Sequence, residues 1–255
     1  MDKPNVFRTS NFYMNKWDKL IVRIKTVSGD PIQLDLVSGD TGTVGDSSTF
    51  RVTDKDGNVY RTVIIGNQEW TVDNLRTTTY ADDSPIPNIT DGTLWAADTT
   101  GAYCYYDNDI ANKADYGALY NWYAVDNAAG LVHLTRNGVH ESDWRVPTAA
   151  DWVTLATLLG GNAVAGGKLK SVGYDYFDVP NTGATDEYNF SGRAGGSRGA
   201  TGIFTYKGVR GNHYQSDLSS GNYASRVLFS DLTSLGSTAA LNGNNGYSVR
   251  LVRDI

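Results

Sequence analysis

Alternating apolar and polar residues near the N-terminus predict a small antiparallel β unit. Lys19 to Thr26 places apolar residues at every second position, and the same alternation returns from Pro31 to Val37. Residues 27–30, which separate the two runs, include the Ser, Gly and Asp that favour turns. We therefore predict a small β-rich module over residues 1–50, in which the Gly, Ser and Thr residues of 41–50 are either a linker or a loop.

After this module the pattern changes and predicts further strands. Val59–Ile65 has the composition of a strand, Gly66–Asn67 favours a turn, and Gln68–Val72 follows as a second strand. These three segments together predict a β-hairpin. Shorter strands are expected close to the C-terminus, at Ser225–Phe229 and Tyr247–Val252.

Two short helices are predicted in the middle of the chain. In Tyr116–Val125 apolar residues recur at i, i+3 and i+4. The second helix begins after Thr148 as N-cap, with Asp151 in an acidic variant of the capping box, and ends at Gly160–Gly161. Its buried face consists of Trp152, Leu155 and Leu159. Because the residues after Gly166 are rich in Gly and Asn, we expect a loop-rich C-terminal half and an α+β fold.

The composition narrows the class of protein. Hydrophobic residues make up 40% of the 255 residues, and 28 Gly and 16 Tyr suit a packed fold with many turns and a polar aromatic surface. A net charge of -6 without a basic cluster argues against nucleic acid as a partner. Since neither a secretory signal after Met1 nor a long apolar run is present, we expect no export by the usual signal route and no membrane insertion.

The polar residues do not predict a catalytic centre or a metal site. Cys104 is the single cysteine, which excludes an internal disulfide and a thiolate cluster, and we expect it to be buried as a small apolar residue. The three histidines are too few and too far apart for a zinc site. A calcium site using Asp107 and Asp109 is an alternative to a solvated turn, which we prefer because Asp often accepts hydrogen bonds from its own backbone. We expect no enzymatic activity, no cofactor and no bound metal.

Two polar segments have residue types found in catalytic motifs. His140–Asp143 contains triad-like residues without a nucleophile elbow, and we predict a polar loop leading into Trp144. Gly195–Gly199 lacks the Lys-Ser/Thr ending of a phosphate-binding loop, and we predict an ordinary loop.

A series of motifs occurs in an order that resembles a known family. The motifs are Asp56–Tyr60, Ile65–Trp70, Asn74–Arg76, Thr100–Tyr106, Tyr116–Val125, Trp144–Thr148 with Asp151–Trp152, Gly166–Lys170, Asn181–Thr185 and Gly246–Arg250. Residues 54–254 thereby resemble the Fibrobacter succinogenes major paralogous domain, a module of Bacteroidetes surface proteins and their phages within the C-type lectin-like superfamily. The resemblance implies a C-type lectin-like domain over residues 51–255. The tryptophans inside the motifs are expected in its core: Trp70, Trp122, Trp144 and Trp152.

The chain departs from the patterns of these relatives in three respects. Leu251 stands where the family often has a Cys, so the resemblance implies that Cys104 has lost a partner. His213–Ser216 stands where the family tends to have Trp-Trp-Ser-Ser, and keeps aromatic character only at Tyr214. The Glu-Pro-Asn or Gln-Pro-Asp loop of calcium-dependent lectins is missing, because Ile86–Asn88 lacks the carboxylate.

In this fold, ligand recognition usually involves the loops and strands of the C-terminal half. Residues 211–245 combine Tyr, Asn, Ser, Asp and Gly, as antibody loops do, and similar domains of diversity-generating retroelements vary such positions. The alternative is that Asn and Gly here only build turns. The candidate ligand-binding residues are His213, Tyr214, Asp217, Asn222, Tyr223, Asn242, Asn244 and Asn245.

These features lead to the hypothesis of a non-enzymatic binding protein in a bacteriophage virion, as a tail fibre, head fibre or surface decoration. Its lectin-like domain would recognise host cell-surface glycan or protein. The N-terminal module would attach to other virion proteins, and we expect a homo-oligomer. The alternatives are an adhesin or lipoprotein on a bacterial cell surface and a purely structural assembly protein of the virion.

Overall fold

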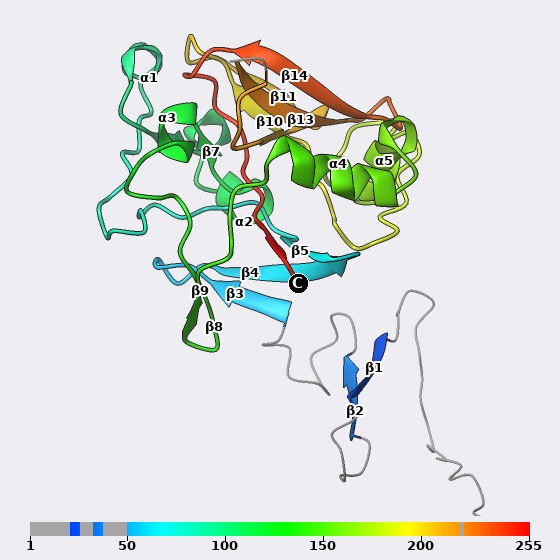
Figure 1. Ribbon diagram of the computed structural model, residues 1–255. Coiled ribbons are helices and arrows are strands. Elements are labelled where there is room, and N and C mark those ends of the chain that lie inside the picture. The colour runs from blue at the N-terminus through cyan, green and yellow to red at the C-terminus, as the bar shows by residue number, and fades with distance from the viewer. Residues whose placement is uncertain (1–20, 26–32, 38–49, 220–221) are drawn as a thin grey trace, which may run out of the picture. The chain divides into compact units, whose positions relative to one another are not determined.

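The two strands predicted near the N-terminus form an antiparallel pair. The computed structural model describes residues 21–25, 33–37, 50–219 and 222–255, and its contacts divide the chain into units Met1–Thr49 and Phe50–Ile255. In the first unit, β1 (Ile21–Lys25) pairs with β2 (Gln33–Val37), which confirms both strands (Figure 1). The predicted turn at 27–30 and residues 41–49 lie outside the described residues.

The first sheet of the Phe50–Ile255 unit consists of six antiparallel strands. Their order is β15 (Val252–Asp254), β5 (Gln68–Thr71), β4 (Val59–Ile65), β3 (Arg51–Thr53), β8 (Leu134–Arg136) and β9 (Val139–Glu141). The predicted hairpin is confirmed, with Ile65 opposite Gln68 across the Gly66–Asn67 turn. The predicted strand Tyr247–Val252 is wrong in its bounds, because β15 begins at Val252 and Tyr247 forms only an isolated bridge with Tyr120.

The segment predicted as a polar loop before Trp144 begins inside the β8–β9 hairpin. Glu141 is the last residue of β9. Its carboxylate accepts hydrogen bonds from Arg136 Nε at 2.9 Å and from Trp144 Nε1 at 2.7 Å, and lies 3.2 Å from Arg253 Nη1. The prediction of a loop is therefore wrong for His140 and Glu141, whose strand is tied to β15 by this ion-pair network.

The second sheet occupies much of the C-terminal half. Its order is β11 (Phe204–Lys207), β10 (Gly195–Arg198), β12 (Arg210–Tyr214), β13 (Tyr223–Phe229) and β14 (Leu235–Leu241). Neighbouring strands are antiparallel except β10 and β12, which pair in parallel through Gly196 and Gly211. The segment Gly195–Gly199 is therefore a strand over most of its length, and the loop predicted there is wrong. The predicted strand Ser225–Phe229 is confirmed as part of β13.

The second predicted helix is confirmed in detail. In α4 (Ala149–Leu158) the Thr148 side chain accepts from the Asp151 backbone N–H, and the Asp151 carboxylate accepts from the Thr148 backbone N–H. Trp152, Leu155 and Leu159 are buried as predicted. The described residues contain further helices that the prediction missed: α1 (Gly92–Ala97), α2 (Asn112–Tyr116), α5 (Asn162–Leu169) and the 3₁₀ turn η2 (Tyr106–Asn108). Another short helix, α3 (Trp122–Val125), lies inside the range predicted for the first helix.

The helix predicted over Tyr116–Val125 is wrong as a single helix, because the range is interrupted after Tyr116 and is helical again only at Trp122–Val125. Gly117 has φ +71°, and a Cβ at this position would lie 2.7 Å from the carbonyl oxygen of Leu75. This left-handed, closely approached residue ends α2, because only glycine fits there without strain. The chain then forms β7 (Leu119–Tyr120), which pairs with β6 (Tyr103–Cys104), before the single turn of α3. The apolar spacing reflects burial in a strand and a turn and not one helical face.

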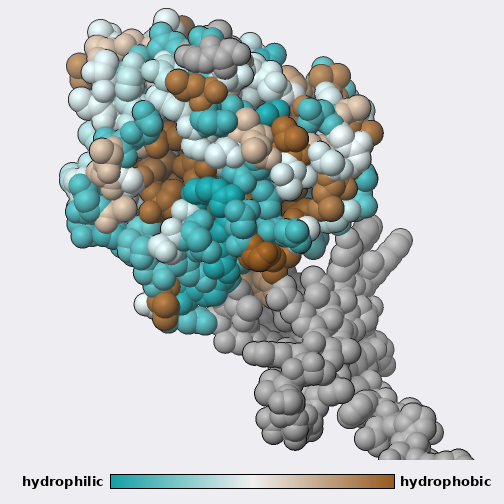
Figure 2. Space-filling view, in the orientation of Figure 1, coloured by the Kyte–Doolittle hydropathy of each residue, from teal (hydrophilic) through white to brown (hydrophobic). Residues whose placement is uncertain are grey.

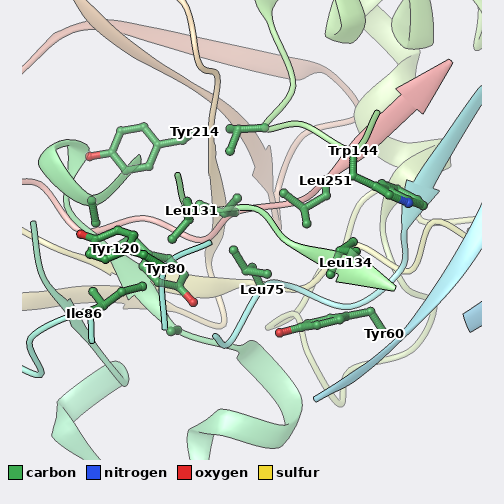
Figure 3. Packing of buried hydrophobic residues seen from close by; sticks show 14 of the residues in the cluster. Tyr60, Leu75, Tyr80, Ile86, Tyr120, Leu131, Leu134, Trp144, Tyr214 and Leu251 are labelled. Carbon is green, nitrogen blue, oxygen red and sulfur yellow. The ribbon is translucent and has the colours of Figure 1, made fainter. Parts of the chain in front are cut away.

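The side chains between these elements form two large buried clusters and a smaller one. Figure 3 shows the first, in which Leu75, Leu131 and Leu251 lie in the middle, with Tyr120 towards one side and Trp144 towards the other. The second contains Trp70 and Trp152 with ring centroids 4.8 Å apart. The predicted burial of all four motif tryptophans is confirmed. Cys104 is buried as predicted, in the third cluster with Trp95, whereas Leu251 belongs to the first cluster.

The arrangement of the elements leaves one end of the second sheet surrounded by loops. Figure 1 shows the six-stranded sheet at the bottom of this unit and the five-stranded sheet at the top, with α4 and α5 on one side and α1 and α3 on the other.

Two buried cations hold connecting segments in place. Arg250 donates to the carbonyl oxygens of Thr71, Phe190 and Ser191, and Lys170 Nζ donates to those of Thr182, Phe229 and Leu232.

Candidate binding site

Three segments far apart in the sequence meet at one end of the five-stranded sheet, and we call this region the loop end. Its members are Trp122 and Tyr123 of α3, Asn222 and Tyr223 at the start of β13, and residues 242–245 after β14. The Trp122 and Tyr223 rings have centroids 4.8 Å apart at an angle of 30°. The backbone N–H of Trp122 donates to the carbonyl oxygen of Gly243 at 2.9 Å. Most of the C-terminal candidates therefore do come together here.

The asparagines of the loop end mainly hold its own backbone. Asn242 Oδ1 accepts from the N–H of Asn244 at 2.9 Å, and the Asn242 carbonyl oxygen accepts from the N–H of Asn245 at 2.9 Å. Asn244 is buried, and its Nδ2 donates to the carbonyl oxygens of Trp95 and Asp98, while Trp95 Nε1 donates back to the Asn244 carbonyl oxygen. The turn is thereby fastened to α1, as expected for asparagines that build turns.

Two of the predicted ligand-binding residues lie in the interior. Tyr214 has 0% of its surface exposed, and its hydroxyl donates to the carbonyl oxygen of Asn245 at 2.6 Å. His213 is 1% exposed, with Nε2 3.3 Å from Asn74 Oδ1, and burial with the positive Arg250 lowers its pKa to about 3. A ligand cannot reach either side chain without displacing the core. The structure therefore places three of the predicted ligand-binding residues, His213, Tyr214 and Asn244, away from the surface.

Asp217 lies at the start of α4 and outside the loop end. Its Oδ1 accepts from the N–H of Ala149, the first residue of the helix, at 2.6 Å. A carboxylate at this place satisfies one of the free helical N–H groups and opposes the helix dipole. Its observed role is to join the segment after β12 to α4.

The remaining candidates form a small exposed face. Asn222 and Asn242 are exposed, and Tyr223 and Asn245 are half-buried. Asn245 Oδ1 also accepts from the N–H of Ala200 at 3.2 Å, and its Nδ2 donates to Asn242, so its amide is used within the protein. A partner at the loop end therefore meets chiefly Asn222, Tyr223 and Asn242.

A second surface was not predicted, and we call it the tyrosine groove. It is an open cavity of about 370 Å³ between η2, the end of α2, the segment before Pro180 and the turn from β11 to β12. Its walls carry four tyrosines, two aspartates and one lysine: Tyr106, Tyr116, Tyr174, Tyr176, Asp175, Asp178 and Lys207. Aromatic walls with a few converging polar groups are typical of small-molecule sites.

The tyrosine groove has one local signature in the sequence. Residues 174–178 read Tyr-Asp-Tyr-Phe-Asp, an alternation of aromatic and acidic residues within a Gly-rich region. In the structure Phe177 is buried and anchors this segment, while its neighbours line the groove. The other walls come from residues about 60 positions earlier and 30 later, which sequence patterns alone do not bring together.

Cys104 and Asp109, two residues with reactive or metal-binding side chains, have structural roles here. Burial raises the pKa of the Cys104 thiol to about 12, so the thiol is protonated at neutral pH. Asp109 Oδ1 accepts from the N–H of Ala111 at 2.9 Å, which confirms the expected turn at this residue. In the described part of the chain, no three His, Cys, Asp or Glu side chains are grouped so that they could hold a metal ion.

The surface itself is mainly polar. Figure 2 shows one face, on which hydrophobic residues form separate patches within a mixed and largely hydrophilic surface. Separate apolar side chains of this kind are ordinary on proteins. No helix among the described residues has the length and apolar character needed to span a membrane.

Within residues 50–219 and 222–255, a six-stranded sheet, a five-stranded sheet, the β6–β7 pair and five short helices define an α+β domain. A family model, described as the Fibrobacter succinogenes major domain, matches residues 63–253. The chain therefore belongs to this family, which confirms the resemblance inferred from the ordered motifs. Comparisons with curated proteins and with solved structures give no match.

Proposed function

We propose that the Phe50–Ile255 unit is a non-enzymatic recognition domain with a C-type lectin-like fold, which binds glycan or protein on a host cell surface. The observation that carries this proposal is the half-buried Tyr223 ring, which packs against the buried Trp122 with ring centroids 4.8 Å apart and an angle of 30°. Tyrosine gives a large contact area at a low cost in conformational entropy, and a ring already held by its neighbour loses still less on binding.

The environment of Tyr223 supports recognition by a fixed surface. Trp122 is held by the hydrogen bond to Gly243, and the 242–245 turn is fastened to α1 through Asn244. The exposed side chains of Asn222 and Asn242 add polar surface to the same face. An aromatic anchor beside adaptable polar groups is the usual composition of a protein recognition surface.

The proposed setting is a bacteriophage virion, where the Met1–Thr49 unit attaches the domain to other virion proteins in a homo-oligomer. This setting rests on the resemblance of the motifs to modules of Bacteroidetes surface proteins and their phages. The same recognition surface would serve a bacterial adhesin. Mass spectrometry of purified phage particles distinguishes the two, since peptides of this chain are expected in the particles and their absence would contradict the virion setting.

Competition for adsorption tests the recognition role. The purified full chain is expected to reduce adsorption of the particles to host cells, and Tyr223→Ala is expected to weaken this competition about tenfold or more. Tyr206→Ala is the matched control, because Tyr206 is also an exposed tyrosine of the same sheet but lies on β11. If Tyr223→Ala, Asn222→Ala and Asn242→Ala all compete like the unchanged chain, the loop end is a structural element of the assembly instead.

A further inference from the structure

We propose that the tyrosine groove is a binding site for a neutral saccharide, separate from the loop end. This site goes beyond the proposed recognition through Tyr223, because the two surfaces share no residue. Its volume of about 370 Å³ lies at the lower end of the range of about 300 to 1,000 Å³ that is usual for small-molecule sites. One or two sugar rings suit this size.

The first support is a set of groups that the protein itself does not use. Tyr174 is 64% exposed, and within the described residues no hydrogen bond or ring contact holds its side chain. The carboxylates of Asp175 and Asp178 likewise have no hydrogen-bond donor in the described part of the chain. These three side chains are therefore available to a ligand, in contrast to the satisfied amides of the 242–245 turn.

The second support is that the segment bearing these groups is held in place. The backbone N–H of Asp178 donates to the carbonyl oxygen of Gly208 at 2.7 Å. Gly208 has φ +79°, a backbone conformation that favours glycine, and its Cα lies close to the Asp178 carboxylate. Asn181 Nδ2 donates to the carbonyl oxygens of Ser171 at 3.0 Å and Gly173 at 2.7 Å, which closes the segment from its other side.

Aromatic and charged contacts fix the remaining lining and join it to residues 174–178. The Tyr116 and Tyr176 rings meet edge to face with centroids 6.0 Å apart, and the Tyr176 hydroxyl donates to Asp115 Oδ1 at 3.3 Å. Lys207 Nζ donates to Asn112 Oδ1 at 2.7 Å, which uses one of its three donors. A site whose walls are ordered before binding loses less entropy when the ligand arrives.

The chemistry of the walls favours a polyhydroxylated ring. Each hydroxyl of a sugar both donates and accepts hydrogen bonds, which suits a lining that combines the acceptors of Asp175 and Asp178 with the remaining donors of Lys207. The C–H faces of a sugar ring are weakly positive and pack on the negative face of an aromatic ring such as Tyr174. The groove therefore provides for both the polar edge and the apolar face of the same ligand.

The charges of the groove disfavour an anionic ligand. Lys207 Nζ already lies 5.0 Å from the centre of the Tyr116 ring, and the Arg193 guanidinium lies 4.2 Å from that of Tyr176. The Tyr116 and Tyr176 faces are thus occupied by cations of the protein. An anion would meet the carboxylates of Asp175 and Asp178, which no described cation pairs within 4.0 Å. A neutral polyhydroxylated ligand avoids this repulsion and uses these acceptors and the Lys207 donors together.

Saturation-transfer NMR on the full chain tests this proposal, with glucose, galactose, mannose and N-acetylglucosamine as probes. At least one sugar is expected to receive saturation at its ring C–H protons with millimolar affinity. Tyr174→Ala is expected to weaken binding about two- to tenfold, in line with the energy of an aromatic contact. Asp178→Ala, which removes an acceptor, should weaken it further, and circular dichroism of each variant establishes that it is folded.

Two control variants show whether a loss of sugar binding is specific to the groove. Tyr206→Ala, which replaces an exposed tyrosine next to Lys207 but outside the groove, should bind like the unchanged chain, and so should Tyr223→Ala. The proposal is overturned if none of the four sugars binds, or if binding is insensitive to both Tyr174→Ala and Asp178→Ala. It is also overturned if choline or sialic acid binds in the groove and the neutral sugars do not. Each of these results leaves the proposed role of Tyr223 untouched.

Discussion

The loop end and the tyrosine groove contain similar residue types but use them differently. Around the loop end the Tyr214 hydroxyl and the Asn244 amide bond backbone carbonyl groups inside the domain, and both side chains are buried. In the groove Tyr174 and Asp175 face solvent and make no such bonds within the described residues. Composition alone therefore does not distinguish a scaffold from a recognition surface. The two are distinguished by whether each polar atom forms a hydrogen bond within the domain or faces solvent.

The largest expected effect comes from the core of the loop end. Tyr214→Ala should lower the free energy of unfolding by about 3–5 kcal/mol, because a fully buried aromatic ring is lost and a cavity remains. Tyr214→Phe removes only the hydroxyl bond to Asn245 and should cost about 1 kcal/mol. Urea denaturation measures both. Equal stability of Tyr214→Ala and the unchanged chain would mean that Tyr214 is not part of the scaffold.

Replacing Asn244 should lower the free energy of unfolding as well, but by less than replacing Tyr214. Asn244→Ala removes the donors to the Trp95 and Asp98 carbonyl oxygens and should cost about 2–3 kcal/mol. Asn242→Ala is the matched control, since Asn242 is exposed and its side chain makes one backbone contact, so about 1 kcal/mol or less is expected. A larger loss for Asn242→Ala than for Asn244→Ala would reverse the assignment.

The buried His213 should make the stability depend on pH. Because its folded pKa is about 3 and its ordinary value is 6.5, the unfolded state binds more protons between these values. The free energy of unfolding therefore decreases as the pH falls through this window, by about 2 kcal/mol between pH 7 and pH 5. Denaturation midpoints measured across that range check the sign and the size.

Two histidine variants separate this effect from other titrations. His213→Gln should flatten the slope of stability against pH between pH 7 and pH 5. Burial and the neighbouring His140 also lower the pKa of His133, so His133→Gln should flatten the slope in the same direction, but less because this residue is more exposed. An unchanged slope in His213→Gln would show that His213 is charged or accessible in the folded protein.

The smallest change in stability is expected in the groove. Tyr174→Ala should alter the free energy of unfolding by no more than about 0.5 kcal/mol, because an exposed side chain without internal contacts adds little to folding. Thermal unfolding detects any larger loss. A cost above about 2 kcal/mol would place Tyr174 in the scaffold with Tyr214 and remove the contrast between the two regions.

Local signals in the sequence predicted local structure well. The Thr148–Asp151 capping box, the hairpin around Gly66–Asn67 and the burial of the motif tryptophans depend on neighbouring residues or on ordered motifs, and all are found. The helix over Tyr116–Val125 failed because the carbonyl of Leu75, 42 positions before Gly117, decides the backbone there. Apolar spacing carries no information about such a distant contact.

The candidate site was harder to predict for the same reason. The Tyr- and Asn-rich tract from 211 to 245 supplies most residues of the loop end, but its sequence does not show that Tyr214 and His213 are buried in the sheet. The groove was missed because its walls come from four separate segments. The sequence shows only the alternation of aromatic and acidic residues over 174–178. This alternation indicates a groove only once the burial of Phe177 is known.

A map of backbone amide shifts during a titration with the bound sugar tests the contrast between the two regions most directly. The account predicts shifts at Lys207, Gly208 and residues 174–178, with the amides of Asn222, Tyr223 and Asn242 unchanged. Shifts confined to the loop end, or an even spread of small shifts over the whole domain, would contradict it.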